Sequence, residues 1–165
     1  MGLRGILMLA GACAGGAGVS QFPEFSQQYL QRLAGQVDAL QQVVENFDAS
    51  AARNGLTREA ALGQMTGTVF LADRQTDLRG DFARYDRLSG DLALLRAATP
   101  LERLAMPHRL ADTATFQATW ADYRPAVPAT SDGVIAAGVG AALGWAAVAA
   151  LLAALAWPFR RLRGA

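Results

Sequence analysis

The residues of this chain that could do chemistry are few, and the most regular of them are three aspartates. Asp73, Asp77 and Asp81 are spaced four apart, so a helix would present all three on one face, where like charges repel one another. A divalent cation or an arginine-bearing partner would relieve that repulsion. The alternative is a solvated helix face on which neighbouring arginines offset the three negative charges. Surface charges of this kind are commonly inert. The spacing favours the solvated face and leaves cation binding open.

His108 is the only histidine, so any serine, cysteine or metal catalysis that needs an imidazole would depend on it. It follows a proline at an expected helix start, which is typical of a surface or capping position. The chain has no phosphate-binding glycine loop, nucleophile elbow, paired-histidine zinc motif or paired-cysteine motif. We therefore expect a non-enzyme with no catalytic residue, no metal site and no cofactor.

The C-terminal region predicts a membrane span. Gly133 to Phe159 is a run of 27 residues without a charged side chain, and Arg160, Arg161 and Arg163 follow it. About 20 apolar residues cross the hydrocarbon layer, and basic residues beside a span stay in the cytoplasm. We expect 133–159 to be a transmembrane span and 160–165 to be a basic cytoplasmic tail.

A second charge-free run, from Gly5 to Pro23, has three interpretations. It is a retained span, a secretory signal cleaved beside Cys13, or a lipoprotein signal ending at Cys13. The lipoprotein signal is the poorest fit because Ala10 stands where leucine is usual. We expect a retained first span, residues 1–22, with the N-terminus in the cytoplasm. Neither run contains an ionisable residue other than cysteine. An ion-coupled carrier would therefore lack the acidic, basic or histidine side chains that usually form its ion or proton pathway.

Two spans with both termini in the cytoplasm place residues 23–132 on the far side of the membrane, as one domain's worth of chain. This region holds 11 Arg and 14 acidic residues, hence a net charge of −3 and no polybasic surface for nucleic acid. The lone Cys13 lies in the first span, so no intramolecular disulfide can form. The stability of the domain must come from helix packing.

Apolar residues in this domain recur at spacings of three and four, and no stretch alternates with period two. The first such helix follows Pro23, which either starts a new helix after the span or kinks a continuous one. It should end near Asn54-Gly55, with Thr57 capping the next helix. That second helix should run from about Arg58 into the nineties, with a break possible at Gly80 or Gly90.

A short helix should start at Thr99-Pro100, and a further one should run from His108 to Tyr123. The fold class is therefore all-α: a two-pass membrane hairpin carrying an elongated helical bundle or helical hairpin.

Glycine-lined spans predict close helix packing. In lipid, association depends on backbone approach, which small residues at a spacing of four permit. The packing would be either between the two spans of one chain or between subunits, and Trp145 would fill a gap in mid-membrane. The residues predicted to pack are Gly11, Gly15, Gly138, Gly140 and Gly144.

Four residues after the first span are predicted to contact the membrane surface or a neighbouring protein. They are Phe22, Pro23, Phe25 and Tyr29, because thin helical rods leave aromatic side chains in need of cover. The expected partners are the lipid bilayer and either further copies of the chain or another membrane complex.

Several stretches resemble a proteobacterial protein family that is catalogued only as a domain of unknown function. They are Ser20 to Tyr29 (S-Q-F-P-E-F-S-Q-Q-Y), Phe47 to Ala51 with Gly55-Leu56, Arg84 to Leu88, Ala118 to Trp120, and Arg124 to Pro128. The resemblance covers nearly the whole chain, and S-Q-F-P-E-F is its most specific part. It implies a small inner-membrane protein without an assigned activity and confers no catalytic residue.

Two hypotheses of function follow. The first is a structural or interaction subunit of the inner membrane whose periplasmic domain self-associates or docks on another complex. The alternative is an oligomeric pore of the mechanosensitive type, in which the Gly/Ala-rich first span lines a hydrophobic constriction.

Overall fold

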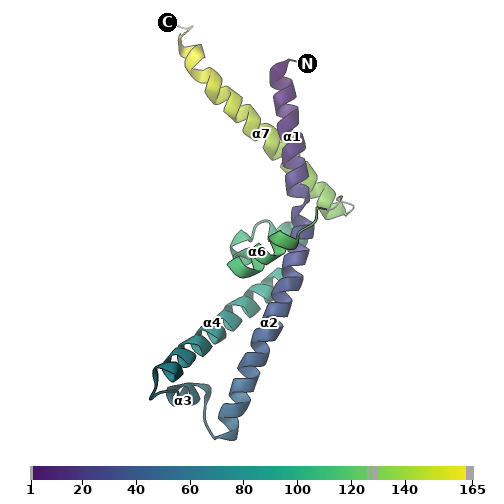
Figure 1. Cartoon of the computed structure of the whole chain (residues 1–165). Coiled ribbons are helices and arrows are strands. Elements are labelled where there is room, and N and C mark those ends of the chain that lie inside the picture. The colour runs from purple at the N-terminus through teal and green to yellow at the C-terminus, as the bar shows by residue number, and fades with distance from the viewer. Residues whose placement is uncertain (1, 126, 128–129, 163–165) are drawn as a thin grey trace. The chain divides into compact units, whose positions relative to one another are not determined.

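The structure is a computed structural model that describes residues 2–125, 127 and 130–162, with side chains to Trp157. The predicted tail 160–165 therefore lies partly outside the described residues, as Arg163 does. Within the described chain every element is a helix, which confirms the all-α prediction (Figure 1). The elements are α1 (Leu3–Ser20), α2 (Phe22–Arg53), α3 (Arg58–Gly63), α4 (Val69–Ala97), α5 (Pro100–Arg103), the 3-10 helix η1 (Pro107–Leu110), α6 (Thr113–Asp122) and α7 (Ser131–Leu162).

The chain divides into two compact units. The first unit contains residues 1–27, 100–105 and 120–165, and the second contains 28–99 and 106–119. Helices α1, α5 and α7 belong to the first unit, and α3, α4 and η1 belong to the second. Residues from Trp120 onward thus group with the two apolar helices rather than with the hairpin of α2 and α4.

Pro23 lies just after a one-residue interruption between two helices. α1 ends at Ser20 and α2 begins at Phe22, which puts the proline in the first turn of α2, where a missing N–H is tolerated. Gln21 between them keeps right-handed helical angles (φ −79°, ψ −17°). Its carbonyl accepts from the Phe25 N–H at 3.0 Å, so the interruption is one residue long.

The predicted boundary after α2 is confirmed. Gly55 adopts a left-handed φ of +68°, and the Leu56 N–H donates to the Ala51 carbonyl at 2.9 Å, closing the end of the helix. Thr57 then caps α3, because its side-chain oxygen accepts from the Ala60 N–H at 3.2 Å.

The expected continuous helix from Arg58 into the nineties is wrong, since it breaks between α3 and α4. Gly67 has a φ of +97°, and Thr68 caps α4 by accepting from the Leu71 N–H at 3.2 Å. The break is at neither Gly80 nor Gly90, which lie inside α4. A helical glycine costs about 1 kcal/mol, and α4 offsets that cost by burying five large apolar side chains: Leu78, Phe82, Leu88, Leu92 and Leu95.

The helix expected from His108 to Tyr123 is also interrupted. Pro107 to Leu110 form a 3-10 turn, and α6 starts only at Thr113. Asp112 causes the restart, because its Oδ1 accepts from the Thr115 N–H at 3.0 Å in the manner of an N-cap.

The second unit is held together by an apolar cluster that joins α2, α3 and α4. Its buried members are Val44, Leu62, Leu78 and Phe82. Phe47 meets Phe82 edge to face, with ring centroids 5.3 Å apart.

Arg58 of α3 spans the edge of this cluster. Its guanidinium carbon lies 4.8 Å from the centre of the Phe82 ring, and its Nε donates to Asp48 Oδ1 at 2.8 Å. That hydrogen bond holds the pKa of the Asp48 carboxyl below its usual range. The short helix α3 is thereby tied to both long helices.

A polar network joins α2, α4 and the start of α6. Arg84 Nη2 donates to Gln36 Oε1 at 2.9 Å and to Asp112 Oδ1 at 3.1 Å, and the Thr115 hydroxyl donates to the same carboxylate at 2.7 Å. Burial alone would raise the pKa of Asp112, but the bonds from Thr115 and Arg84 outweigh it and the pKa is lowered. The carboxylate is therefore stabilised in its charged form.

Tyr29 lies fully buried in the same unit. Among the described residues its hydroxyl has no hydrogen-bond partner, and burial, as the main cause, raises its pKa to about 12. An unpaired buried hydroxyl costs about 1–3 kcal/mol.

We expect Asp112→Asn to destabilise the protein by about 1–3 kcal/mol at neutral pH, because it weakens a buried charge-assisted network. A depressed carboxyl pKa contributes stability above the pKa of the unfolded chain, about 3.9, and that contribution is lost as the pH falls through the folded-state pKa. The deficit should therefore shrink in acid. Thermal or denaturant unfolding of the detergent-solubilised chain as a function of pH measures it.

Two controls fix the interpretation of that experiment. Asp38→Asn, at an exposed aspartate of α2, should leave stability unchanged within about 0.5 kcal/mol. Tyr29→Phe should leave it unchanged or raise it, because it removes the unpaired hydroxyl. A large loss in Tyr29→Phe would show that the hydroxyl is hydrogen-bonded in solution.

Candidate functional site

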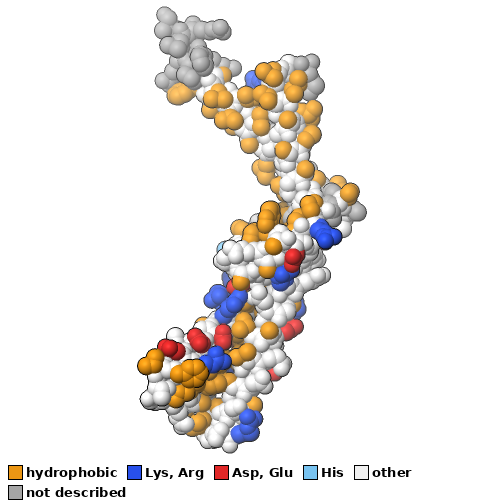
Figure 2. Space-filling view, viewed as in Figure 1, with side chains coloured by type: hydrophobic (Ala, Val, Ile, Leu, Met, Phe, Trp, Pro, Cys, Tyr) orange, Lys and Arg blue, Asp and Glu red, His pale blue; other side chains and the backbone are white. Residues whose placement is uncertain are grey.

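Among the described residues, two helices are long and apolar enough to cross a membrane. One candidate segment is Leu3–Arg53, whose apolar part is α1, and the other is Ser131–Trp157 within α7. Only 11% and 6% of their apolar windows is buried within the chain, so neither is the covered core helix of a soluble domain. The 18 residues of α1 rise about 27 Å, close to the ~30 Å hydrocarbon thickness. Figure 2 shows hydrophobic side chains covering much of both helices.

α1 and α7 cross inside the first unit, and glycines occupy the crossing point (Figure 1). A Cβ added to Gly15 would lie under 3.0 Å from the Gly140 carbonyl oxygen, and one added to Gly144 would lie under 3.0 Å from the Gly11 carbonyl. The atoms in the way are backbone atoms, which cannot rotate aside. The two helices therefore approach at a distance that only glycine allows.

Four of the five glycines predicted to pack line this crossing: Gly11, Gly15, Gly140 and Gly144. The fifth, Gly138, has no atom within 4 Å of the place a Cβ would take, and the structure leaves it outside the crossing. Gly16 belongs to the crossing although it was not singled out from the sequence. Its added Cβ would lie 3.1 Å from the Ala137 carbonyl oxygen. Its position next to Gly15 in the sequence is the feature that could have indicated this contact.

The four residues predicted to contact the membrane surface or a neighbour are largely covered by the chain itself. Phe22 is half-buried, Pro23 is buried, Phe25 is 7% exposed and Tyr29 is 0% exposed. The ring of Phe25 meets that of Trp120 edge to face at 6.0 Å. These side chains support the fold and offer little surface to a partner.

The residues considered for chemistry lie in the second unit. Asp73 and Asp77 are exposed on α4, and Arg74 Nη1 lies 3.9 Å from Asp77 Oδ2. Among the described residues no group of three His, Cys, Asp or Glu side chains could hold a metal ion.

His108 is exposed on η1 and borders a depression of about 490 Å³ together with Asp91 and Asp112. Both of these carboxylates are bonded to arginines, Asp91 to Arg109 at 2.8 Å and Asp112 to Arg84. Each of the two carboxylates is thereby paired with a cation.

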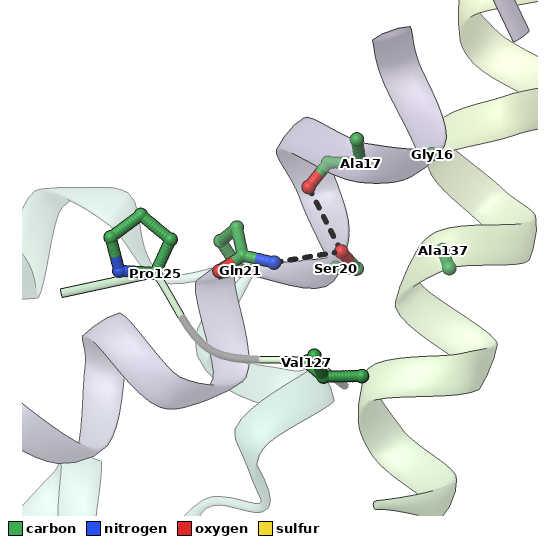
Figure 3. Close-up of a pocket in the computed structure, with 7 residues that line it drawn as sticks. All are labelled: Gly16, Ala17, Ser20, Gln21, Pro125, Val127 and Ala137. Carbon is green, nitrogen blue, oxygen red and sulfur yellow. Dashed lines mark hydrogen bonds between the residues drawn. The ribbon is translucent and has the colours of Figure 1, made fainter. Parts of the chain in front are cut away.

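A second depression, of about 470 Å³, lies at the end of α1 (Figure 3). It is open and mostly apolar, and its walls are Gly16, Ala17, Ser20, Gln21, Pro125, Val127 and Ala137. The Ser20 hydroxyl donates to the Ala17 carbonyl at 2.9 Å and accepts from the Gln21 amide at 3.2 Å. The walls contain no titratable side chain, so the depression has no acid or base to offer.

Comparison with known proteins gives one match. A family model described as "Protein of unknown function (DUF2937)" matches residues 3–161, which confirms the resemblance to a family of unknown function. No curated protein matches the chain. No solved structure matches it either.

We expect Gly15→Leu and Gly144→Leu to drive α1 and α7 apart, because the new side chain has only backbone to push against. Overpacking of this kind costs about 1–3 kcal/mol or more. The unfolding temperature of the detergent-solubilised protein should fall accordingly. Gly18→Leu and Gly138→Leu are the matched controls, since both positions have open space around the added Cβ. Equal losses in all four variants would contradict a glycine-specific crossing.

Proposed function

We propose that this chain, which belongs to the DUF2937 family of proteins of unknown function, is a non-catalytic membrane protein that serves in assembly. In this proposal α1 and α7 cross the bilayer as one hairpin, and the helical domain between them contacts other proteins. The glycine crossing carries the proposal. It pairs two apolar helices through backbone contact, which is the form of association that works where no hydrophobic effect operates.

The charges support one orientation of the hairpin. Arg4 lies in the first turn of α1, before its charge-free part, and Arg160, Arg161 and Arg163 follow the charge-free part of α7. Basic residues close to short spans are retained in the cytoplasm. Both termini would then be cytoplasmic and the central domain periplasmic, with the bacterial inner membrane as the location.

Exposed apolar side chains support a contact role for the second unit. Val69 and Phe70, at the start of α4, are 80% and 75% exposed. Figure 2 shows hydrophobic side chains gathered at this end of the hairpin, beside α3. Large apolar side chains that remain in water are candidates for burial in an interface. The occupant of that interface would be another copy of the chain or another membrane complex.

The pore alternative is not supported by the glycines on which it relied. A pore lined by the first span needs a small-residue face turned toward a lumen, and here Gly11 and Gly15 face α7 of the same chain. No other observation favours a pore, so it is not carried forward.

Topology is the first test. In a Cys13→Ser background, we expect Asp38→Cys and Arg96→Cys to react with a membrane-impermeant maleimide in spheroplasts, because both positions are exposed in the central domain. A C-terminal epitope tag should become accessible to antibody only after the membrane is permeabilised. Protection of both cysteines until permeabilisation would overturn the proposed orientation.

Assembly is the second test. Burying a phenylalanine contributes about 1.5–3 kcal/mol, so Phe70→Ser should weaken self-association by about tenfold or more. The mass of the intact protein in mild detergent, measured over a concentration series, reports it. Ala83→Ser, at an exposed position of the same helix, is the control. A wild-type chain that stays monomeric throughout contradicts self-association, and cross-linking in intact membranes then tests docking on a different complex.

A further inference from the structure

Three aromatic side chains of the first unit form a cluster at the end of α1. The rings of Trp120 and Tyr123 stack with centroids 6.4 Å apart and planes 20° apart. Phe25 meets both edge to face, at 6.0 Å from Trp120 and 5.6 Å from Tyr123. Such contacts contribute about 0.5–1.5 kcal/mol each beyond simple burial. The three rings therefore hold one another in fixed positions.

A hydrogen bond fixes the cluster relative to the apolar helix. The Tyr123 hydroxyl donates to Gln21, whose carbonyl oxygen lies at 3.2 Å and whose side-chain Oε1 lies at 3.0 Å. Gln21 is the residue directly after the last residue of α1. The rings consequently lie at the level where the apolar helix ends.

Exposure divides the cluster into an inner and an outer part. Phe25 is almost fully buried, whereas Trp120 remains 66% exposed although its ring is one of the largest apolar surfaces in the chain. Arg124, the residue after Tyr123, is exposed too. The outer part thus consists of the exposed indole of Trp120 beside the half-buried ring of Tyr123.

We propose that the outer face of Trp120 and Tyr123 is a lipid-contact surface that lies in the headgroup layer of the bilayer leaflet where α1 ends. The proposal rests on the proposed function, in which α1 and α7 cross the membrane. Tryptophan and tyrosine are enriched at this depth because each has an apolar ring and a polar group. The exposed apolar side chains of α1 and α7 lie in the same compact unit as the aromatic cluster.

The tryptophans of the chain can serve as fluorescent probes in a test of this proposal. Trp120, Trp145 and Trp157 are the three tryptophans, and Trp145 is half exposed within the charge-free part of α7. Trp145→Phe with Trp157→Phe leaves Trp120 as the only indole. Trp120→Phe with Trp157→Phe leaves Trp145 as the matched control. Neither double variant adds bulk to the helices.

Each full-length variant is reconstituted in phosphatidylcholine and phosphatidylglycerol vesicles whose acyl chains are brominated either close to the headgroup or close to the chain end. We expect the emission of Trp120 to be quenched more by shallow bromine than by deep bromine, and that of Trp145 to show the reverse. Iodide in the aqueous phase should quench Trp120 less in vesicles than in the denatured chain.

The outcomes separate the two proposals. If Trp145 is quenched by deep bromine while Trp120 responds to neither lipid, the spans hold and the lipid-contact surface is overturned. In that case strong iodide quenching places Trp120 in water, and weak iodide quenching shows that protein covers it. If neither tryptophan responds to brominated lipid, the membrane hairpin fails as well.

Discussion

The backbone contact between α1 and α7 is the constraint on which the first unit depends. At Gly15, Gly140 and Gly144 no side chain separates α1 from α7. Close approach lets many weak dispersion contacts add up, which matters most where the surroundings are as apolar as the helices themselves. One added methylene at this point has no direction in which to relax. The crossing therefore fixes the axial register of the two helices as well as their proximity.

The second unit relies on a different balance of forces. Its cluster around Leu62 and Phe82 buries apolar side chains, and paired polar groups fix the positions of the helices relative to one another. Arg58 joins α3 to α2 through Asp48, and Arg84 joins α4 to α2 and to the start of α6. The partly buried charges of these pairs are tolerated because each is hydrogen-bonded.

The different features of the two units suit the proposed role in assembly. In the proposed function, the hairpin of apolar helices would supply attachment, and the exposed side chains of Val69 and Phe70 would offer a surface to a partner. The aromatic cluster of Phe25, Trp120 and Tyr123 adds a layer at the end of α1, where an apolar helix meets polar surroundings. None of these features requires a reaction, and each places hydrophobic surface where another phase or another protein can cover it.

The sequence by itself determined the helical class, the two charge-free helices and the helix end at Gly55 with the cap at Thr57, because each follows from local composition or from one residue's backbone freedom. It failed at Gly67 and Asp112, where a single residue that caps or bends the chain outweighed an otherwise continuous apolar pattern. Only the tertiary structure decided that Gly140 and Gly144 rather than Gly138 face α1, and that Phe25 packs on Trp120. Those choices depend on how each helix is rotated about its own axis and on residues far apart in the chain, and a repeating pattern of small or apolar residues fits several such rotations equally well.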